Sequence, residues 1–141
     1  MAELHTTSSN IIAVFASSEA CDRVLTPDGV TLMRTSPREM LLVGPVDTEA
    51  IRGALEEPGA IVDDVTDGWA AFRLAGVDSR DAFARVCELE LPAEGWVQGE
   101  VARAAAKIIV ASDGLTILVR AMLGAHVEER IRADAAEVLA P

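Results

Sequence analysis

The sequence has few basic residues and no long apolar run. Lysine and arginine number 12 against 23 aspartates and glutamates, which gives a formal net charge of −11 at pH 7. Nucleic-acid binding needs a basic stripe that displaces counterions, so we expect no nucleic-acid partner and no docking on an anionic membrane. No stretch reaches about 18 apolar residues, and the N-terminal segment lacks a basic start before an apolar stretch. We therefore expect neither a transmembrane helix nor a signal peptide.

Cysteine and the common catalytic motifs are also scarce. The two cysteines, Cys21 and Cys87, share no metal-binding or redox spacing, which favours reduced thiols and a cytoplasmic location. The glycine-rich phosphate-binding motifs and the Gly-x-Ser-x-Gly nucleophile motif are absent. Cys87 falls on the inward face of a predicted helix, where cysteine is usually a small core residue. The absence of these motifs favours a subunit or binding module over a self-sufficient enzyme.

Only two histidines occur, and neither has a catalytic neighbour in sequence. His5 lies in residues 1–10, which are polar and predicted to be flexible. His126 falls in the first turn of the last predicted helix, where it could act as a general base or contact a partner. We interpret His126 instead as an exposed residue at the start of the helix, because no carboxylate or nucleophile lies at a spacing typical of a catalytic pair. We therefore predict no catalytic histidine.

Asp63, Asp64 and Asp67 form the one acidic cluster with a possible chemical role. Three carboxylates within five residues could hold a hard cation, but their spacing does not fit an EF-hand loop. A turn at Asp67-Gly68 accounts for one of them, and no opposing group supports acid–base work. We predict no metal, cofactor-binding or catalytic residue in this chain.

Three large side chains are the candidates for contact with a partner. Trp96 lies in a predicted connection, residues 89–99, where it would either cover the core or anchor a partner. Arg103 and Arg120 lie in predicted strand segments and could hold a partner's carboxylate, although arginines at a sheet rim often only extend into solvent. We predict a partner interface containing Trp96, Arg103 and Arg120.

Apolar periodicity supplies the predicted elements. From Trp69 the apolar residues alternate with strand period, and Asp78 then caps a helix. Asp113-Gly114 predicts a type I′ hairpin, and Glu128 to Arg132 has the spacing of a helical ion pair. Predicted strands cover residues 11–16, 30–35, 40–44, 69–75, 101–112 and 115–120. Predicted helices cover residues 18–25 and 79–88, the segment from Asp47 to Pro58-Gly59, and residues 125–139.

This order predicts an α+β fold built from a duplicated β-α-β-β-α unit. We expect a mostly antiparallel sheet of about six strands with helices packed on it. Residues 11–141 are predicted to form a single domain with two pseudo-repeats, at about 11–59 and 60–141.

Five segments resemble one known family in order along the chain. They are SPREMLLVGP (36–45), DVTDGWAAFRLAG (64–76), CELELP (87–92), GWVQG (95–99) and DGLTILVRA (113–121). Together they resemble the gamma subunit of heterotetrameric sarcosine oxidase, over about residues 11–135. That family is related to the folate-binding domains of the glycine cleavage T protein. The chain departs from the family pattern at Met40, Arg103-Ala104 and Ala121, which marks it as a divergent relative.

The resemblance implies a non-catalytic, gamma-type subunit of a flavin-dependent oxidase or demethylase of sarcosine or a related N-methyl amine. In that family the gamma subunit carries no cofactor, while FAD, FMN, NAD and tetrahydrofolate belong to the larger subunits. The expected partners are therefore alpha and beta subunits, and the expected role is to brace the folate-handling alpha subunit. A stand-alone folate-binding or one-carbon transfer domain is the alternative, with Asp64, Asp67 and Arg103 as its candidate residues. A scaffold in an unrelated complex is a third interpretation.

Overall fold

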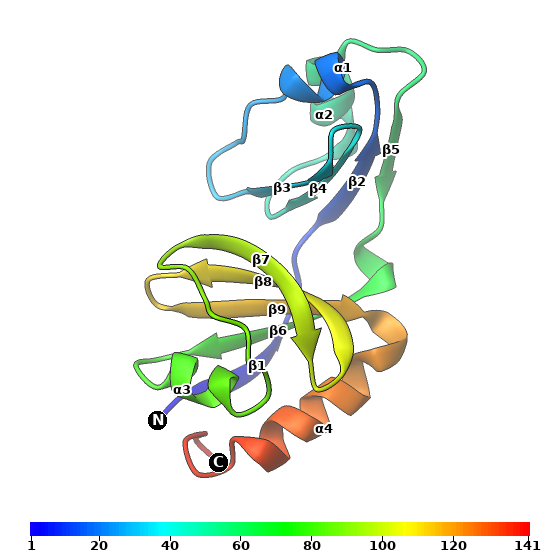
Figure 1. Ribbon diagram of the computed structural model, residues 1–141. Coiled ribbons are helices and arrows are strands. Elements are labelled where there is room, and N and C mark those ends of the chain that lie inside the picture. The colour runs from blue at the N-terminus through cyan, green and yellow to red at the C-terminus, as the bar shows by residue number, and fades with distance from the viewer. The chain divides into compact units, whose positions relative to one another are not determined.

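Two separate antiparallel sheets organise the chain in the computed structural model, which describes all residues from 1 to 141 (Figure 1). One unit consists of residues 9–66, and the other consists of residues 1–8 and 67–141. Each unit has its own sheet, its own helices and its own apolar core.

The unit of residues 9–66 follows the order β-α-β-β-α-β. Its sheet order is β3-β4-β2-β5, so the split β-α-β pattern predicted for this part of the chain is confirmed. Asp47 caps α2 as predicted, because its carboxylate accepts the backbone N–H of Ala50 at 2.8 Å. Both helices pack on one face of the sheet, where Ile12, Leu42 and Ile51 are buried. The elements are β2 (Ile11–Phe15), α1 (Ser18–Asp22), β3 (Thr31–Ser36), β4 (Glu39–Val43), α2 (Thr48–Leu55) and β5 (Ile61–Asp64).

The unit of residues 1–8 and 67–141 has five strands in the order β1-β6-β9-β8-β7. Helices α3 and α4 lie on one face, where Phe83 and Ile131 meet Phe72, Ile108 and Ile117 in a shared core. The elements are β1 (Glu3–Thr7), β6 (Trp69–Ala75), α3 (Ser79–Ala84), β7 (Gly95–Val101), β8 (Ala104–Ala111), β9 (Gly114–Arg120) and α4 (Gly124–Asp134), with short 3₁₀ turns at Thr66–Gly68 and Ala121–Leu123.

Successive side chains of a strand point to opposite faces of a sheet. The side chains that alternate with the core residues therefore point to the face of this five-stranded sheet that α3 and α4 do not cover. We call it the helix-free face. Its register places Trp69 opposite Arg120, and Gln98 opposite Lys107. The side chains of this face used below are Trp69, Trp96, Gln98, Glu100, Lys107, Ile109 and Arg120.

The α+β class and the antiparallel pairing are confirmed, but the strands form two sheets of five and four where one sheet of about six was predicted. Residues 3–7, in the segment predicted to be flexible, form β1, which pairs with β6. Only Leu4 of this strand is buried, so its polar sequence carries little strand signal. The compact units also divide after residue 66, whereas the predicted repeats divide after residue 59.

The predicted hairpin between residues 112 and 115 exists, but its turn type is different. Ala111 pairs with Gly114, so Ser112 and Asp113 form the connection, and neither has a positive φ. A type I′ turn requires positive φ at both central residues, so the prediction of that turn type is wrong here. The predicted ion pair on α4 is confirmed, with Arg132 and Glu128 3.0 Å apart.

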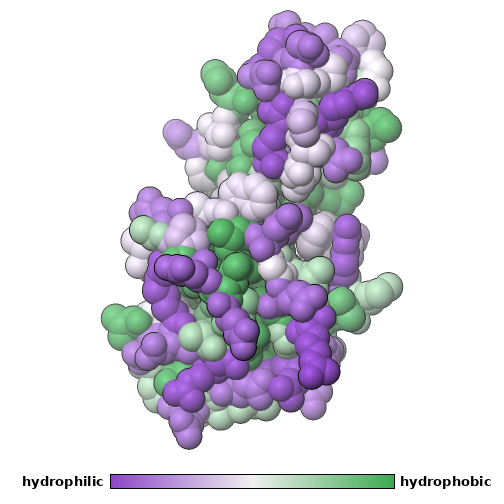
Figure 2. All heavy atoms as spheres, in the orientation of Figure 1, coloured by the Kyte–Doolittle hydropathy of each residue, from purple (hydrophilic) through white to green (hydrophobic).

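Hydrophilic side chains, in purple, cover much of the face shown in Figure 2, with smaller green areas of apolar side chains between them. None of the helices combines the length and the apolarity that crossing a membrane would require.

Candidate functional site

Arg103 lies in the tight turn between β7 and β8, in a conformation that its residue type disfavours. Ala102 and Arg103 have φ values of 50° and 67°, which are positive at both central positions, as a type I′ turn requires. Asparagine and glycine usually occupy such positions, because a Cβ makes the left-handed region costly. Two contacts hold the turn: Ala102 donates its N–H to the carbonyl of Val86 at 3.2 Å, and His126 Nε2 donates to the carbonyl of Ala102 at 3.1 Å.

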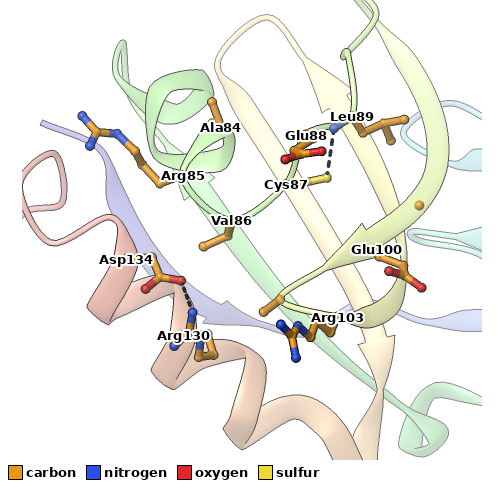
Figure 3. Close-up of a pocket in the computed structure, with 12 residues that line it drawn as sticks. Ala84, Arg85, Val86, Cys87, Glu88, Leu89, Glu100, Arg103, Arg130 and Asp134 are labelled. Carbon is orange, nitrogen blue, oxygen red and sulfur yellow. Dashed lines mark hydrogen bonds and ion pairs between the residues drawn. The ribbon is translucent and has the colours of Figure 1, made fainter.

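A cavity of about 670 Å³ opens beside this turn (Figure 3). Its walls come from the end of α3, the following connection, the β7–β8 turn and α4. Arg130 donates to Asp134 at 2.7 Å, and Figure 3 shows Arg85 pointing away from Arg103 and Arg130. The lining residues are Ala84, Arg85, Val86, Cys87, Glu88, Leu89, Gly99, Glu100, Ala102, Arg103, Arg130 and Asp134.

Arg103 is the free cation of this region. A second cavity, of about 330 Å³, is lined by Ala102, Arg103, His126 and Arg130, with no carboxylate among them. Arg103 is exposed and forms neither an ion pair nor a side-chain hydrogen bond, whereas Arg130 is paired with Asp134. A guanidinium with all its donors free can bind a carboxylate with two parallel hydrogen bonds. The arrangement can therefore receive an anionic group.

Relief of the strain in this turn predicts a gain in stability. The double substitution Ala102→Asn and Arg103→Gly places residues that tolerate positive φ at both positions, so we expect the free energy of unfolding to rise by about 1 kcal/mol. Arg103→Ala is the matched control, because it removes the guanidinium but keeps a Cβ at positive φ. Urea denaturation measures both variants. No gain from the double substitution would show that the turn carries little strain.

The structure places Trp96 in strand β7, so its prediction as a loop residue is wrong. Trp96 pairs with Ile109 and lies on the helix-free face, partly exposed. The glycines at 95 and 99 made the segment resemble a loop, but pairing with β8 keeps it extended.

Arg120 ends β9 on the same face, exposed, with its guanidinium 4.3 Å from the centre of the Trp69 ring. Trp96 lies two strands away from Arg120, with β8 between β7 and β9. Arg103 sits at the β7–β8 turn. No hydrogen bond or cation–π contact joins the three predicted interface residues.

The histidines and cysteines have local structural roles. His5 contacts a carboxylate oxygen of Glu3 at 3.0 Å on the exposed side of β1. Cys87 is buried and its sulfur accepts the N–H of Leu89 at 3.4 Å. Burial raises the pKa of the Cys21 thiol, which disfavours the reactive thiolate.

Asp64, one of the three residues of the acidic cluster, is engaged in its own turn. Asp64 accepts the N–H of Thr66 at 3.0 Å and its hydroxyl at 2.6 Å, and these bonds hold the pKa of Asp64 below its ordinary value. The Thr66 hydroxyl oxygen also accepts the N–H of Ile11 at 2.9 Å. No group of three or more histidine, cysteine, aspartate or glutamate side chains is placed to hold a metal ion.

No protein-family model matches the sequence, and no curated protein matches it. Among solved structures, a chain of heterotetrameric sarcosine oxidase from Corynebacterium sp. U-96, in complex with pyrrole 2-carboxylate, matches with a TM-score of 0.80 at 15% identity. The match covers 99% of this chain and 86% of that one. The regulatory subunit of aspartate kinase from Thermus thermophilus has a TM-score of 0.48 at 13% identity, with 94% of each chain covered.

The first of these matches confirms, at the level of the fold, the resemblance that the sequence motifs indicate. This chain therefore has the fold of a chain of heterotetrameric sarcosine oxidase.

Proposed function

We propose that this chain is a non-catalytic, gamma-type subunit of a multi-subunit flavin-dependent oxidase or demethylase that acts on sarcosine or a related N-methyl amine. Its role is to brace the folate-handling alpha subunit. FAD, FMN, NAD and tetrahydrofolate belong to the alpha and beta partner subunits. The observation that carries this proposal is the fold match to a chain of heterotetrameric sarcosine oxidase over 99% of this chain.

The side chains that could have carried chemistry support a bracing role. Cys87 lies in the core, Asp64 closes a turn and His126 anchors the β7–β8 turn. Each of these groups already has a structural partner. Arg103 and Arg120 are by contrast exposed, and neither forms an ion pair or donates a side-chain hydrogen bond, so both are suited to contact with another chain.

The proposed interface uses Trp96, Arg103 and Arg120. Tryptophan and arginine are the residue types that most often carry binding energy at protein interfaces. Trp96 is partly exposed on the helix-free face, and both arginines are exposed. A partner that covers these side chains would neutralise two cations and bury one large aromatic ring.

Co-purification tests the proposed function. The tagged chain is expressed in its native host, and the purified material is assayed for flavin absorbance and for co-purifying chains by mass spectrometry. We expect larger flavin-bearing chains in a constant ratio to this one. Recovery of the chain alone would contradict the proposal.

A matched pair of variants tests the interface. Trp96→Ala combined with Arg103→Ala is expected to reduce recovery of the partner chains by about tenfold or more, since truncated hot-spot residues typically cost 2 kcal/mol or more. Arg132→Ala is the control, because Arg132 is exposed on α4 and already paired with Glu128. Equal recovery with both variants would place the interface elsewhere.

Folate binding by the isolated chain stays a prediction. Titration of the purified chain with tetrahydrofolate, followed by calorimetry, tests it directly. Saturable binding would favour the one-carbon interpretation over the subunit role.

A further inference from the structure

The helix-free face carries a groove formed by four neighbouring strands. Its volume is about 520 Å³, and its polar walls come from Gln98 and Glu100 on β7, Lys107 on β8 and Arg120 on β9. Trp69 on β6 supplies a flat apolar wall. Strands β6, β9, β8 and β7 are consecutive neighbours in the sheet, so these side chains share one continuous surface (Figure 1).

Arg120 is held in place but not neutralised. It is the cross-strand partner of Trp69, and its guanidinium carbon lies 4.3 Å from the centre of the indole ring. A cation–π contact uses no hydrogen-bond donor, so the N–H groups of Arg120 remain available to an anion. Arg120 forms no ion pair and no side-chain hydrogen bond, so no bonded carboxylate neutralises this cation at the groove.

Lys107 is the second cation of the groove and the only lysine in the chain. Its ammonium donates to the neutral side-chain oxygen of Gln98 at 3.2 Å and forms no ion pair. Partial burial lowers the pKa of Lys107, and the nearby charge of Arg120 lowers it further. Glu100 lines the same groove without pairing with either cation.

Lys107 and Arg120 are adjacent cations without a carboxylate partner, in a chain with 23 acidic and 12 basic residues. Other arginines of the chain form ion pairs, as the partly buried Arg73 does with Asp113 at 2.6 Å. Mutual repulsion of Lys107 and Arg120 would be removed by an anion placed between them. Glu100 is the one carboxylate of the groove and pairs with neither cation, so Lys107 and Arg120 are left to bind a negative group of another chain.

We propose that this groove is the docking site for an aspartate or glutamate side chain of the partner subunit, which Lys107 and Arg120 bind together while Trp69 covers its apolar stem. The inference rests on the proposed function, because it takes the partner to be a larger subunit of the same complex. It assigns Lys107, Trp69 and Arg120 to one recognition site.

The single lysine makes the proposal directly testable. A carbodiimide forms an amide only between an amine and a carboxylate that lie in contact. We treat the purified complex, carrying a lysine-free tag, with this reagent and map the products by mass spectrometry. We expect a cross-link from Lys107 to one acidic residue of a flavin-bearing partner. A cross-link to a second copy of this chain, or none at Lys107, would overturn the proposal.

Variants provide a second readout. Lys107→Gln combined with Arg120→Ala is expected to weaken capture of the partner by about tenfold or more, since truncating one side of a buried charge pair has an effect of that size. Lys107→Arg keeps the charge, so it should retain capture while losing the cross-link. Arg132→Gln is the control, because Arg132 is already paired on α4.

The outcomes separate the two proposals. Capture of flavin-bearing chains that survives loss of both cations overturns the docking site and leaves the subunit role intact. A cross-link from Lys107 to an identified partner without flavin, together with loss of that partner's capture in the double variant, supports the docking site and overturns the subunit role. A wild-type chain that captures no partner overturns both.

Discussion

Gly114→Ala is expected to lower the free energy of unfolding by more than about 3 kcal/mol. Gly114 begins β9 with a φ of 151°. A Cβ added there would lie 2.2 Å from the carbonyl oxygen of Leu74 and 3.0 Å from the Cα of Ala75. Both atoms belong to the backbone of β6, so the clash can be relieved only by separating β6 from β9.

Two other glycines separate the contributions of strain and clash. Gly95 has a φ of 113° but no atom within 4 Å of an added Cβ, so Gly95→Ala should cost only about 1–2 kcal/mol. Gly53 lies inside α2 with no close atom and no positive φ, so Gly53→Ala should stabilise the chain by about 0.5–1 kcal/mol. Urea denaturation followed by circular dichroism measures all three. A loss for Gly114→Ala no larger than that for Gly95→Ala would contradict the clash.

Ile117→Ala is expected to destabilise the five-stranded unit by about 2–5 kcal/mol. Ile117 is fully buried on β9, the central strand, and is paired with Phe72 and Ile108. Truncation leaves a cavity that these neighbours cannot fill without moving their strands. Both tryptophans belong to this unit, so tryptophan fluorescence during denaturation reports its unfolding selectively.

Ile109→Ala is the matched control for this prediction. Ile109 lies on the adjacent strand β8 but points to the helix-free face and is only partly buried. The same chemical change there should cost about 1 kcal/mol, because less apolar surface returns to water. Equal losses for the two variants would show that the helix side of the sheet is not the dominant core.

Sequence patterns predict helices, caps and strands well where the structure depends on residues that are close together in the sequence. The cap at Asp47 and the ion pair between Glu128 and Arg132 involve residues three or four positions apart, and both are confirmed. The alternation from Trp69 to Ala75 gives a strand for the same reason. The C-terminal ends of two helices differ from the prediction. Helix α3 ends at Ala84 and α4 ends at Asp134, each before its predicted end.

Pairing over long distances decided the elements that were missed. β1 is a polar edge strand whose extended form depends on β6, more than sixty residues away. β7 contains two glycines and only becomes a strand through its pairing with β8. The positive φ values at Ala102 and Arg103 follow from the register of that hairpin, because a two-residue connection must reverse the chain.

The candidate site divides in the same way. The sequence alone indicates Trp96, Arg103 and Arg120 as large side chains without a chemical role. The ordered motifs indicate a fold, and the structural match confirms that fold. Lys107 and Trp69 were not identified, because 51 residues separate Trp69 from its cross-strand partner Arg120 and only the sheet register brings them together. Residue order alone thus determined the class of the fold and the cap of α2 at Asp47, since these depend on contacts within a few residues, whereas Asp78 precedes α3 without the predicted side-chain cap bond. Tertiary structure alone decided the two sheets and the cationic groove, because strand pairing joins residues that no local pattern relates.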